Sequence, residues 1–397
     1  MQLDVMDYVS TDSLPENSTI QTENRSWMIN EDFLFTNHDV LLNSLTPSLV
    51  YMIILFVFGI PGNISVIYIY FCKCRESTTR VFILALAMLD LVHCTFIMPV
   101  EIALLVNFDD FDYPILCKIS RFISSFINNS SAFLLTAIAI DRFKRICRPH
   151  GHIIDHFTAK KLVVCAWIFA VVTSWQMLML YGTRTLKHGK TCLISDHMHD
   201  TIFPVLYVYV LVVGQCITDA LLIIFYSLVG REVCIRKAKR RHRRSQRIST
   251  DVSQIRTSFD FSDEQTPSPT GGITDRFSFI FKREASNNGT RKNDSSRGFS
   301  QESRGSSIRQ TFLSKTTIMM FLVTVGFILS FVPHTMAVIL RYQAKGYIHS
   351  LTTSGMITYQ LFLRSYFLNS VLNPFIYCFV SKQFRNQFKE SVRCCKK

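Results

Sequence analysis

Long apolar runs alternate with short polar stretches along the chain after residue 45. Seven of the runs hold at least the roughly 20 residues that a helix needs to cross the hydrocarbon core of a bilayer. They are Leu49–Phe71, Val81–Val106, Cys117–Cys147, Leu162–Tyr181, Thr201–Val229, Thr316–Leu340 and Ile357–Val380. The pattern predicts an all-α integral membrane protein, a seven-transmembrane helix bundle.

A short amphipathic eighth helix is predicted after the seventh run. Phe384, Phe388 and Val392 recur every four residues within a basic stretch, so they share one face of a helix. Such a helix lies on the membrane surface and does not cross it. The two cysteines that follow, Cys394 and Cys395, are then close enough to the bilayer for palmitoylation.

Charged residues between the runs indicate the orientation. Basic residues collect in the cytoplasmic loops of membrane proteins. Lys73, Arg75 and Arg80 follow the first run, whereas Asp109 and Asp110 follow the second. We therefore expect a multi-pass protein of the plasma membrane, with the amino terminus outside and the carboxyl terminus inside.

Composition agrees with this orientation. Only 18% of the residues are charged, against about 25% in soluble domains. Residues 1–50 hold eight acidic residues and one basic residue, whereas residues 231–247 hold nine basic residues and one acidic residue. This asymmetry argues against a nucleic-acid-binding face and for a chain oriented across a membrane. The twelve cysteines show no spacing typical of a zinc site.

The same features divide the chain into five parts. Residues 1–45 read as a disordered extracellular tail, with glycosylation acceptors at Asn17 and Asn24. The other parts are residues 46–230 with five transmembrane helices, the long basic and Ser-rich third intracellular loop at 231–312, helices six and seven at 313–381, and the amphipathic helix and cytoplasmic tail at 382–397.

Several runs carry short motifs. These are Gly62-Asn63, Asp90 in the middle of the second run, Asp141-Arg142-Phe143 at the end of the third, Trp167, Phe327-x-x-Ser330-Phe331-Val332-Pro333, and Asn373-Pro374-Phe375-Ile376-Tyr377. With them, roughly residues 46–395 resemble the rhodopsin-like (class A) family of G-protein-coupled receptors, and within it the neuropeptide and peptide-hormone receptors. The resemblance implies heterotrimeric G proteins, arrestin, receptor kinases and membrane lipids as partners, and no enzymatic activity.

The resemblance also implies a disulfide bond between Cys117 and Cys192 and an activation switch. In the resting state Arg142 pairs with Asp141, and in the active state it reaches toward the G protein. The other switch residues are Phe327, Phe331, Pro333, Tyr226, Pro374 and Tyr377, of which the prolines lack an N–H donor and let their helices bend. The alternative is that Asp141 and Arg142 only anchor the helix at the membrane interface.

Several positions depart from the family pattern, and three of them bear on the switch and the pocket. Phe331 stands where most relatives carry Trp, Thr218 stands at the usual fifth-span Pro, and Leu313 stands where many relatives place an acid. Without this acid on the sixth span, Arg142 lacks a second resting partner there, so we expect raised basal activity.

Asp90 needs a compensating partner, because a lone charge in the middle of a membrane costs about 2.5–3.5 kcal/mol on insertion scales. Oxygens on other inward faces come from Ser131, Asn369, Ser370 and Asn373. In the family this cluster holds an allosteric sodium ion, which is the one cofactor that the resemblance implies. The alternative is a water-filled polar network without a stable ion.

Four charged residues lie on the outer halves of the spans: Glu101, Arg121, Arg341 and Arg364. Intramembrane charges usually face the bundle interior and find partners. Glu101 and Arg364 stand at similar heights, so they pair internally or, in the functional alternative, a ligand breaks the pair and an Arg binds its carboxylate. Additional pocket contacts are predicted from Ser124, Ser125, Phe331 and His334.

Other classes fit less well. A transporter would show repeats or interrupted helices, and a membrane enzyme would show a catalytic motif such as HExxH or GxSxG; neither is found. Light-sensing opsins need a Lys at the position of Phe367, and small-amine receptors need an Asp at Ser124. An extracellular peptide is the main candidate ligand, and a lipid, another small molecule or no ligand at all remain as alternatives.

Overall fold

The computed structural model describes residues 38–108, 110–149, 151, 153–186, 189–199, 201–260, 301–343 and 351–394. The predicted glycosylation and palmitoylation sites at Asn17, Asn24 and Cys395 lie outside these residues, as does the side chain of Cys394. The chain forms two compact units. One extends to Tyr226 and resumes at Thr316, and the other is Ser227–Lys315.

Seven spans build the first unit, as predicted. They are α3 (His38–Tyr68) with the π-helical turn η2 (Ile69–Lys73); α4 (Thr78–Val92), η3 (His93–Ile97) and α5 (Met98–Val106); α6 (Pro114–Cys147); α7 (His156–Ser174) with α8 (Met177–Leu180); the beginning of α10 (Phe203–Asp260); the end of α12 (Gln301–Gln343); and α13 (Thr353–Leu363), η5 (Ser365–Leu368) and α14 (Asn369–Val380). The predicted surface helix follows as α15 (Lys382–Cys394).

Six of the spans are long and apolar enough to cross a membrane as single helices among the residues that the structure describes. The seventh is divided at Arg364, where η5 separates α13 from α14. Another irregular turn, η3, begins at His93, three residues after Asp90. Both breaks lie where polar side chains enter the bundle, so the irregular backbone serves the sites described below.

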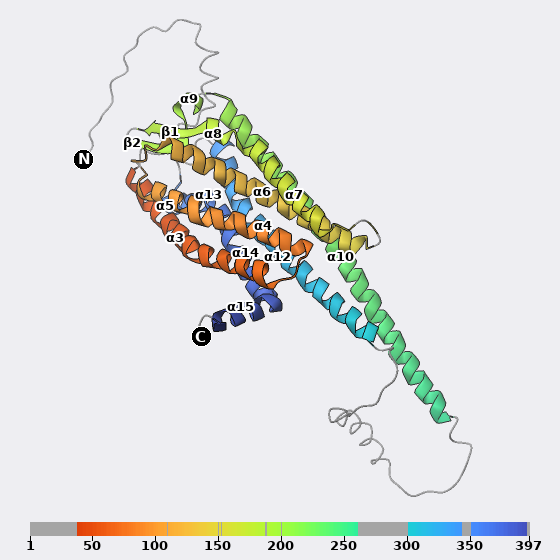
Figure 1. Cartoon of the computed structure of the whole chain (residues 1–397). Coiled ribbons are helices and arrows are strands. Elements are labelled where there is room, and N and C mark those ends of the chain that lie inside the picture. Colours follow the sequence, from red (N-terminus) through yellow and green to blue (C-terminus); the bar gives the residue numbers. More distant parts are fainter. Residues whose placement is uncertain are drawn as a thin grey trace, which may run out of the picture. The chain divides into compact units, whose positions relative to one another are not determined.

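The core sits between helices that pack side by side (Figure 1). The third span, α6, packs against α4 and α7, while α3 packs against α4, α13 and α14. Close approach of α3 requires glycine, because a Cβ at Gly59 would lie 2.5 Å from the Cys94 sulfur. The fully buried side chains in the middle include Phe82, Leu134, Phe327 and Tyr377.

A β-hairpin follows the fourth span and was not predicted from the sequence. Strand β1 (Tyr181–Leu186) pairs antiparallel with β2 (Gly189–Ile194), with Thr183 opposite Cys192. The apolar run was expected to continue through Tyr181, but the helix ends at Leu180 and Tyr181 begins the strand. The hairpin is short and polar, so hydropathy gave no signal for it. We call this end of the bundle the hairpin end.

The helices around the third loop extend beyond the apolar runs that predicted them. α10 continues to Asp260, and α12 begins at Gln301, inside the range 231–312 that was assigned to the loop. The division of the chain at residue 313 stays a prediction, because helix bounds alone do not test where the intracellular loop ends. Hydropathy marks only the membrane part of each helix, whereas Lys, Arg and Gln have high helix propensity and extend a helix into water.

Candidate functional site

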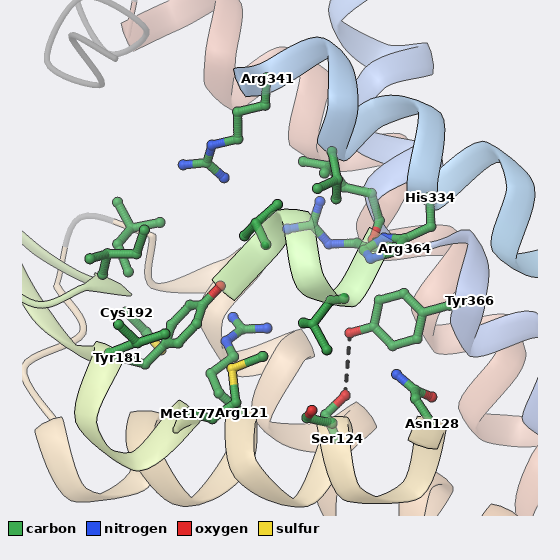
Figure 2. Close-up of a pocket in the computed structure, with 18 of the residues that line it drawn as sticks. Arg121, Ser124, Asn128, Met177, Tyr181, Cys192, His334, Arg341, Arg364 and Tyr366 are labelled. Atoms are coloured by element: carbon green, nitrogen blue, oxygen red, sulfur yellow. Dashed lines mark hydrogen bonds between the residues drawn. The ribbon is translucent and has the colours of Figure 1, made fainter. Parts of the chain in front are cut away.

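The structure places the predicted residues in three groups along the first unit. The first group surrounds a cavity of about 330 Å³ at the hairpin end. Its lining comes from α5, α6, the hairpin, α10, α12 and α13, and includes all seven predicted pocket residues, Glu101, Arg121, Ser124, Ser125, His334, Arg341 and Arg364. Figure 2 shows Arg121, Arg341 and Arg364 entering this space from different helices.

Glu101 holds two of the arginines. Its Oε1 accepts a hydrogen bond from Arg364 Nε at 3.0 Å, and its Oε2 lies 3.1 Å from Arg121 Nη1. Arg364 Nη1 also donates to the backbone and side-chain oxygens of Gln360, at 3.1 and 2.8 Å. The internal Glu101–Arg364 pair that the sequence indicated is therefore present, but it shares its acid with Arg121.

Polar and aromatic side chains form the floor of the cavity. The Ser124 hydroxyl lies 3.5 Å from the Tyr366 hydroxyl (Figure 2) and 3.4 Å from His93 Nε2. His93 Nδ1 in turn lies 2.9 Å from the Ser370 hydroxyl. The rings of Phe331 and His334 contact Tyr366. A chain of hydrogen-bonding groups thus leads from the cavity toward the middle of the bundle.

The predicted disulfide bond is confirmed. Cys117 at the start of α6 is joined to Cys192 on β2, 75 residues later in the chain. An ion pair of 2.8 Å between Lys190 and Asp112 also links the hairpin to the loop that precedes α6. The hydrogen bond from the Lys190 ammonium lowers the pKa of the Asp112 carboxyl below its ordinary value. These links hold β2 beside the cavity.

The second group surrounds Asp90 in the middle of the bundle. Asn373 Nδ2 donates to Asp90 Oδ2 at 2.8 Å, whereas Asp90 Oδ1 has no partner among the described residues. The buried hydroxyl of Ser131 is also without one in that part of the chain. Asn369 is buried as well, while Ser370 turns to His93. Unpaired carboxylate and hydroxyl oxygens are the ligands that hard cations take, so these residues fit the implied sodium ion.

The third group lies at the opposite end of α6. Asp141 is fully buried and binds both Arg142 and Arg145. Arg142 Nη2 donates also to Thr79 at 2.9 Å, and Arg145 Nη2 donates to Ile154 O at 2.7 Å. The Asp141–Arg142 pair has the resting arrangement that the resemblance implies, and Arg145 connects it to the loop before α7.

The remaining switch residues come from α10, α12 and α14. The ring centroids of Phe327 and Phe331 lie 4.4 Å apart with their planes tilted by 31°, and Phe331 precedes Pro333 by two residues. The hydroxyls of Tyr226 and Tyr377 are buried and have no hydrogen-bond partner among the described residues. Arg142 is bonded to Asp141 and Thr79 and to neither tyrosine. Buried polar groups normally have hydrogen-bond partners. The two phenol oxygens can therefore accept a hydrogen bond from a donor that reaches them in another conformation.

Sequence reasoning missed four contributors: His93, Arg145, Gln360 and Tyr366. His93 lies three residues after Asp90, and a buried polar residue one turn from an intramembrane acid is a usable signal. Arg145 follows Asp141 by four residues, the spacing of a helical ion pair. Gln360 lies four residues before Arg364 in the same way. Tyr366 shows no pattern that distinguishes it from a core residue.

Comparison with known proteins agrees with this arrangement. The chain is 32% identical to mouse (Mus musculus) chemerin-like receptor 2 over 146 residues, which is 36% of this chain and 39% of that protein. It is 26% identical to the human (Homo sapiens) neuropeptide S receptor over 195 residues (48% and 52%), and 24% identical to human cholecystokinin receptor type A over 356 residues (86% and 79%). The first two alignments thus span about half of those relatives or less.

A family model described as 7 transmembrane receptor (rhodopsin family) matches residues 62–377. This range begins at Gly62 in α3 and ends at Tyr377 in α14, so it includes all three groups of residues described above. The chain belongs to the rhodopsin family of seven-transmembrane receptors.

Proposed function

We propose that this chain is a plasma-membrane receptor that activates heterotrimeric G proteins when an extracellular peptide binds in the cavity at the hairpin end. The observation that supports a peptide is the cavity itself. It combines four charged side chains with aromatic and hydroxyl groups, which suits a ligand rich in polar groups better than a lipid. The relatives named for a neuropeptide, for cholecystokinin and for chemerin point the same way.

The proposal sets the orientation and the other partners. The hairpin end faces outward, so that the disulfide forms in an oxidising compartment, and Arg142 faces the G protein. The exposed Phe388 and the basic residues of α15 lie against the inner leaflet. Arrestin and receptor kinases would act on the same inner side.

A library of peptides, with lipids and amines included, tests the proposal on cells that express the full chain. The expected result is a peptide that raises calcium or changes cyclic AMP, and that accelerates guanine nucleotide exchange on a purified G protein with this chain. Activation by lipids or amines alone would contradict the peptide part. A chain that reaches the cell surface and promotes no exchange with any G protein, with or without a ligand, would contradict the whole.

We further infer that a sodium ion binds the Asp90 group in the resting state. Asp90 and Ser131 supply the unpaired oxygens, and Asn373 orients the carboxylate. An ion that prefers the resting state must oppose any change that favours the active state, because the coupling is reciprocal.

Sodium chloride is therefore expected to raise the thermal stability of the purified receptor and to lower basal nucleotide exchange, relative to potassium chloride at equal ionic strength. Asp90→Asn should remove both effects, because the amide cannot balance the ion's charge. Thr95→Val is the control, since this hydroxyl lies on the same span but bonds only to the backbone of its own helix in the described structure. An unchanged sodium response in Asp90→Asn would rule out this ion site.

Asp141, which pairs with two arginines in the third group, gives a separate prediction. In Asp141→Asn the side chain keeps its shape but loses both ion pairs, to Arg142 and to Arg145. Arg142 is then held only by weaker hydrogen bonds, so basal nucleotide exchange should rise severalfold. The measurement is exchange without ligand, normalised to surface receptor. Basal exchange equal to that of the parent would show that the acid does not restrain Arg142.

A further inference from the structure

We propose that the ligand carries a carboxylate and that Arg121 of α6 binds it, while Glu101 and Arg364 stay paired. The inference deepens the proposed function, because it names the chemical group that the cavity recognises. It differs from the expectation drawn from the sequence, in which the ligand breaks the Glu101–Arg364 pair.

The charge of the cavity favours an anionic group. Three arginines and one carboxylate line it among the described residues, a formal excess of two positive charges. Two of the arginines come from α6 and α12 and the third, Arg364, directly follows α13, so no single helix supplies the charge. A cavity with low-dielectric walls strengthens the attraction between this excess and an anion.

The arginines are not equivalent. Arg364 is fixed by Glu101 and by both oxygens of Gln360, and only 13% of its side chain is exposed. Its hydrogen bonds join α5 to α13, so Arg364 acts as a positioning residue that holds the wall of the cavity.

Arg121 has more unused capacity. Arg121 pairs with Glu101 through Nη1, its buried Nε has no hydrogen-bond partner among the described residues, and 24% of its side chain is exposed. A guanidinium offers five N–H donors in a plane and binds a carboxylate through two of them at once. The Tyr181 ring lies 5.9 Å from Arg121 Cζ and limits where the guanidinium can turn. Arg121 is thus held in place, yet keeps donors for a second acid.

A carboxylate can come from a peptide's carboxyl terminus or from an acidic side chain. Both present the same two oxygens to Arg121, so the structure assigns the group, and the experiment separates the two sources. Removing Arg121 leaves Glu101 with Arg364 as a neutral pair, so Arg121→Gln should fold. Arg121→Lys keeps the positive charge but loses the pair of parallel N–H donors that binds both oxygens of a carboxylate.

The first arm needs no known agonist. Succinate should raise the unfolding temperature of the purified full-length receptor more than succinamide does, at ionic strength matched with potassium chloride, because a ligand that binds the folded state stabilises it. Arg121→Gln should lose the difference, and Arg121→Lys should reduce it. The control Lys118→Gln removes a positive charge from α6 three residues earlier, outside the cavity lining, and should keep it. Equal shifts for acid and amide, or a shift retained in Arg121→Gln, would overturn the inference.

The second arm uses matched peptides: a free carboxyl terminus against an amide, and Asp or Glu against Asn or Gln. The peptide that loses the relevant carboxylate should lose at least tenfold in potency, about 1.4 kcal/mol, on the parent but not on Arg121→Gln. If amidated peptides without acidic residues activate as well as the acids, the inference fails and the proposed function stands. If no peptide activates, the proposed function fails, and the succinate comparison still decides the carboxylate site.

Discussion

Arg142→Ala is expected to abolish G-protein activation while the receptor still reaches the cell surface. Arg142 is 4% exposed in the resting arrangement and bonded to Asp141 and Thr79. In the proposed switch Arg142 leaves these partners on activation and reaches the G protein, and alanine has no group that could do so. The expected loss is complete within the detection limit of a nucleotide-exchange assay.

The fold should survive this substitution, because Asp141 keeps a second partner. Arg145 Nε lies 2.8 Å from Asp141 Oδ1 and 3.0 Å from Oδ2. The buried carboxylate thus remains neutralised, which avoids the cost of an unpaired buried charge. Lys160→Ala, which removes an exposed positive charge near the start of α7, is the matched control and should signal like the parent. Arg142→Ala with normal exchange would leave the residue as an interfacial anchor only.

Hydropathy and motifs predicted the seven spans, the surface helix and the disulfide, because each depends on local composition or on a fixed position. Partner choice could not be predicted in the same way. Glu101, Arg121 and Arg364 were identified as neighbours in one pocket, but which acid oxygen takes which arginine depends on the broken seventh helix and on Gln360. Arg145 was missed although its spacing from Asp141 indicates a helical ion pair. Its second partner, Ile154 in the next loop, depends on the fold and could not be predicted.

Glu101→Gln is expected to destabilise the receptor far more than Arg364→Gln does. The Glu101 side chain is 7% exposed and forms ion pairs with both Arg121 and Arg364. Without its charge, two guanidinium groups face each other in a partly enclosed cavity with no anion between them. Breaking a buried pair by removing one partner costs about 3–5 kcal/mol, and access of water to the cavity favours the lower value. In Arg364→Gln, by contrast, Glu101 keeps Arg121 as its partner.

The double variant Glu101→Gln/Arg364→Gln decides between this charge argument and a simple packing defect. It leaves Arg121 as the one cation of the former triad, so the repulsion disappears and most of the lost unfolding temperature should return. A packing defect would instead add the two single losses, because each substitution would disturb its own contacts. The measurement is the unfolding temperature of purified receptor, with surface expression as a second readout. Additive losses, or a stable Glu101→Gln receptor, would show that the two arginines do not depend on Glu101 for compensation.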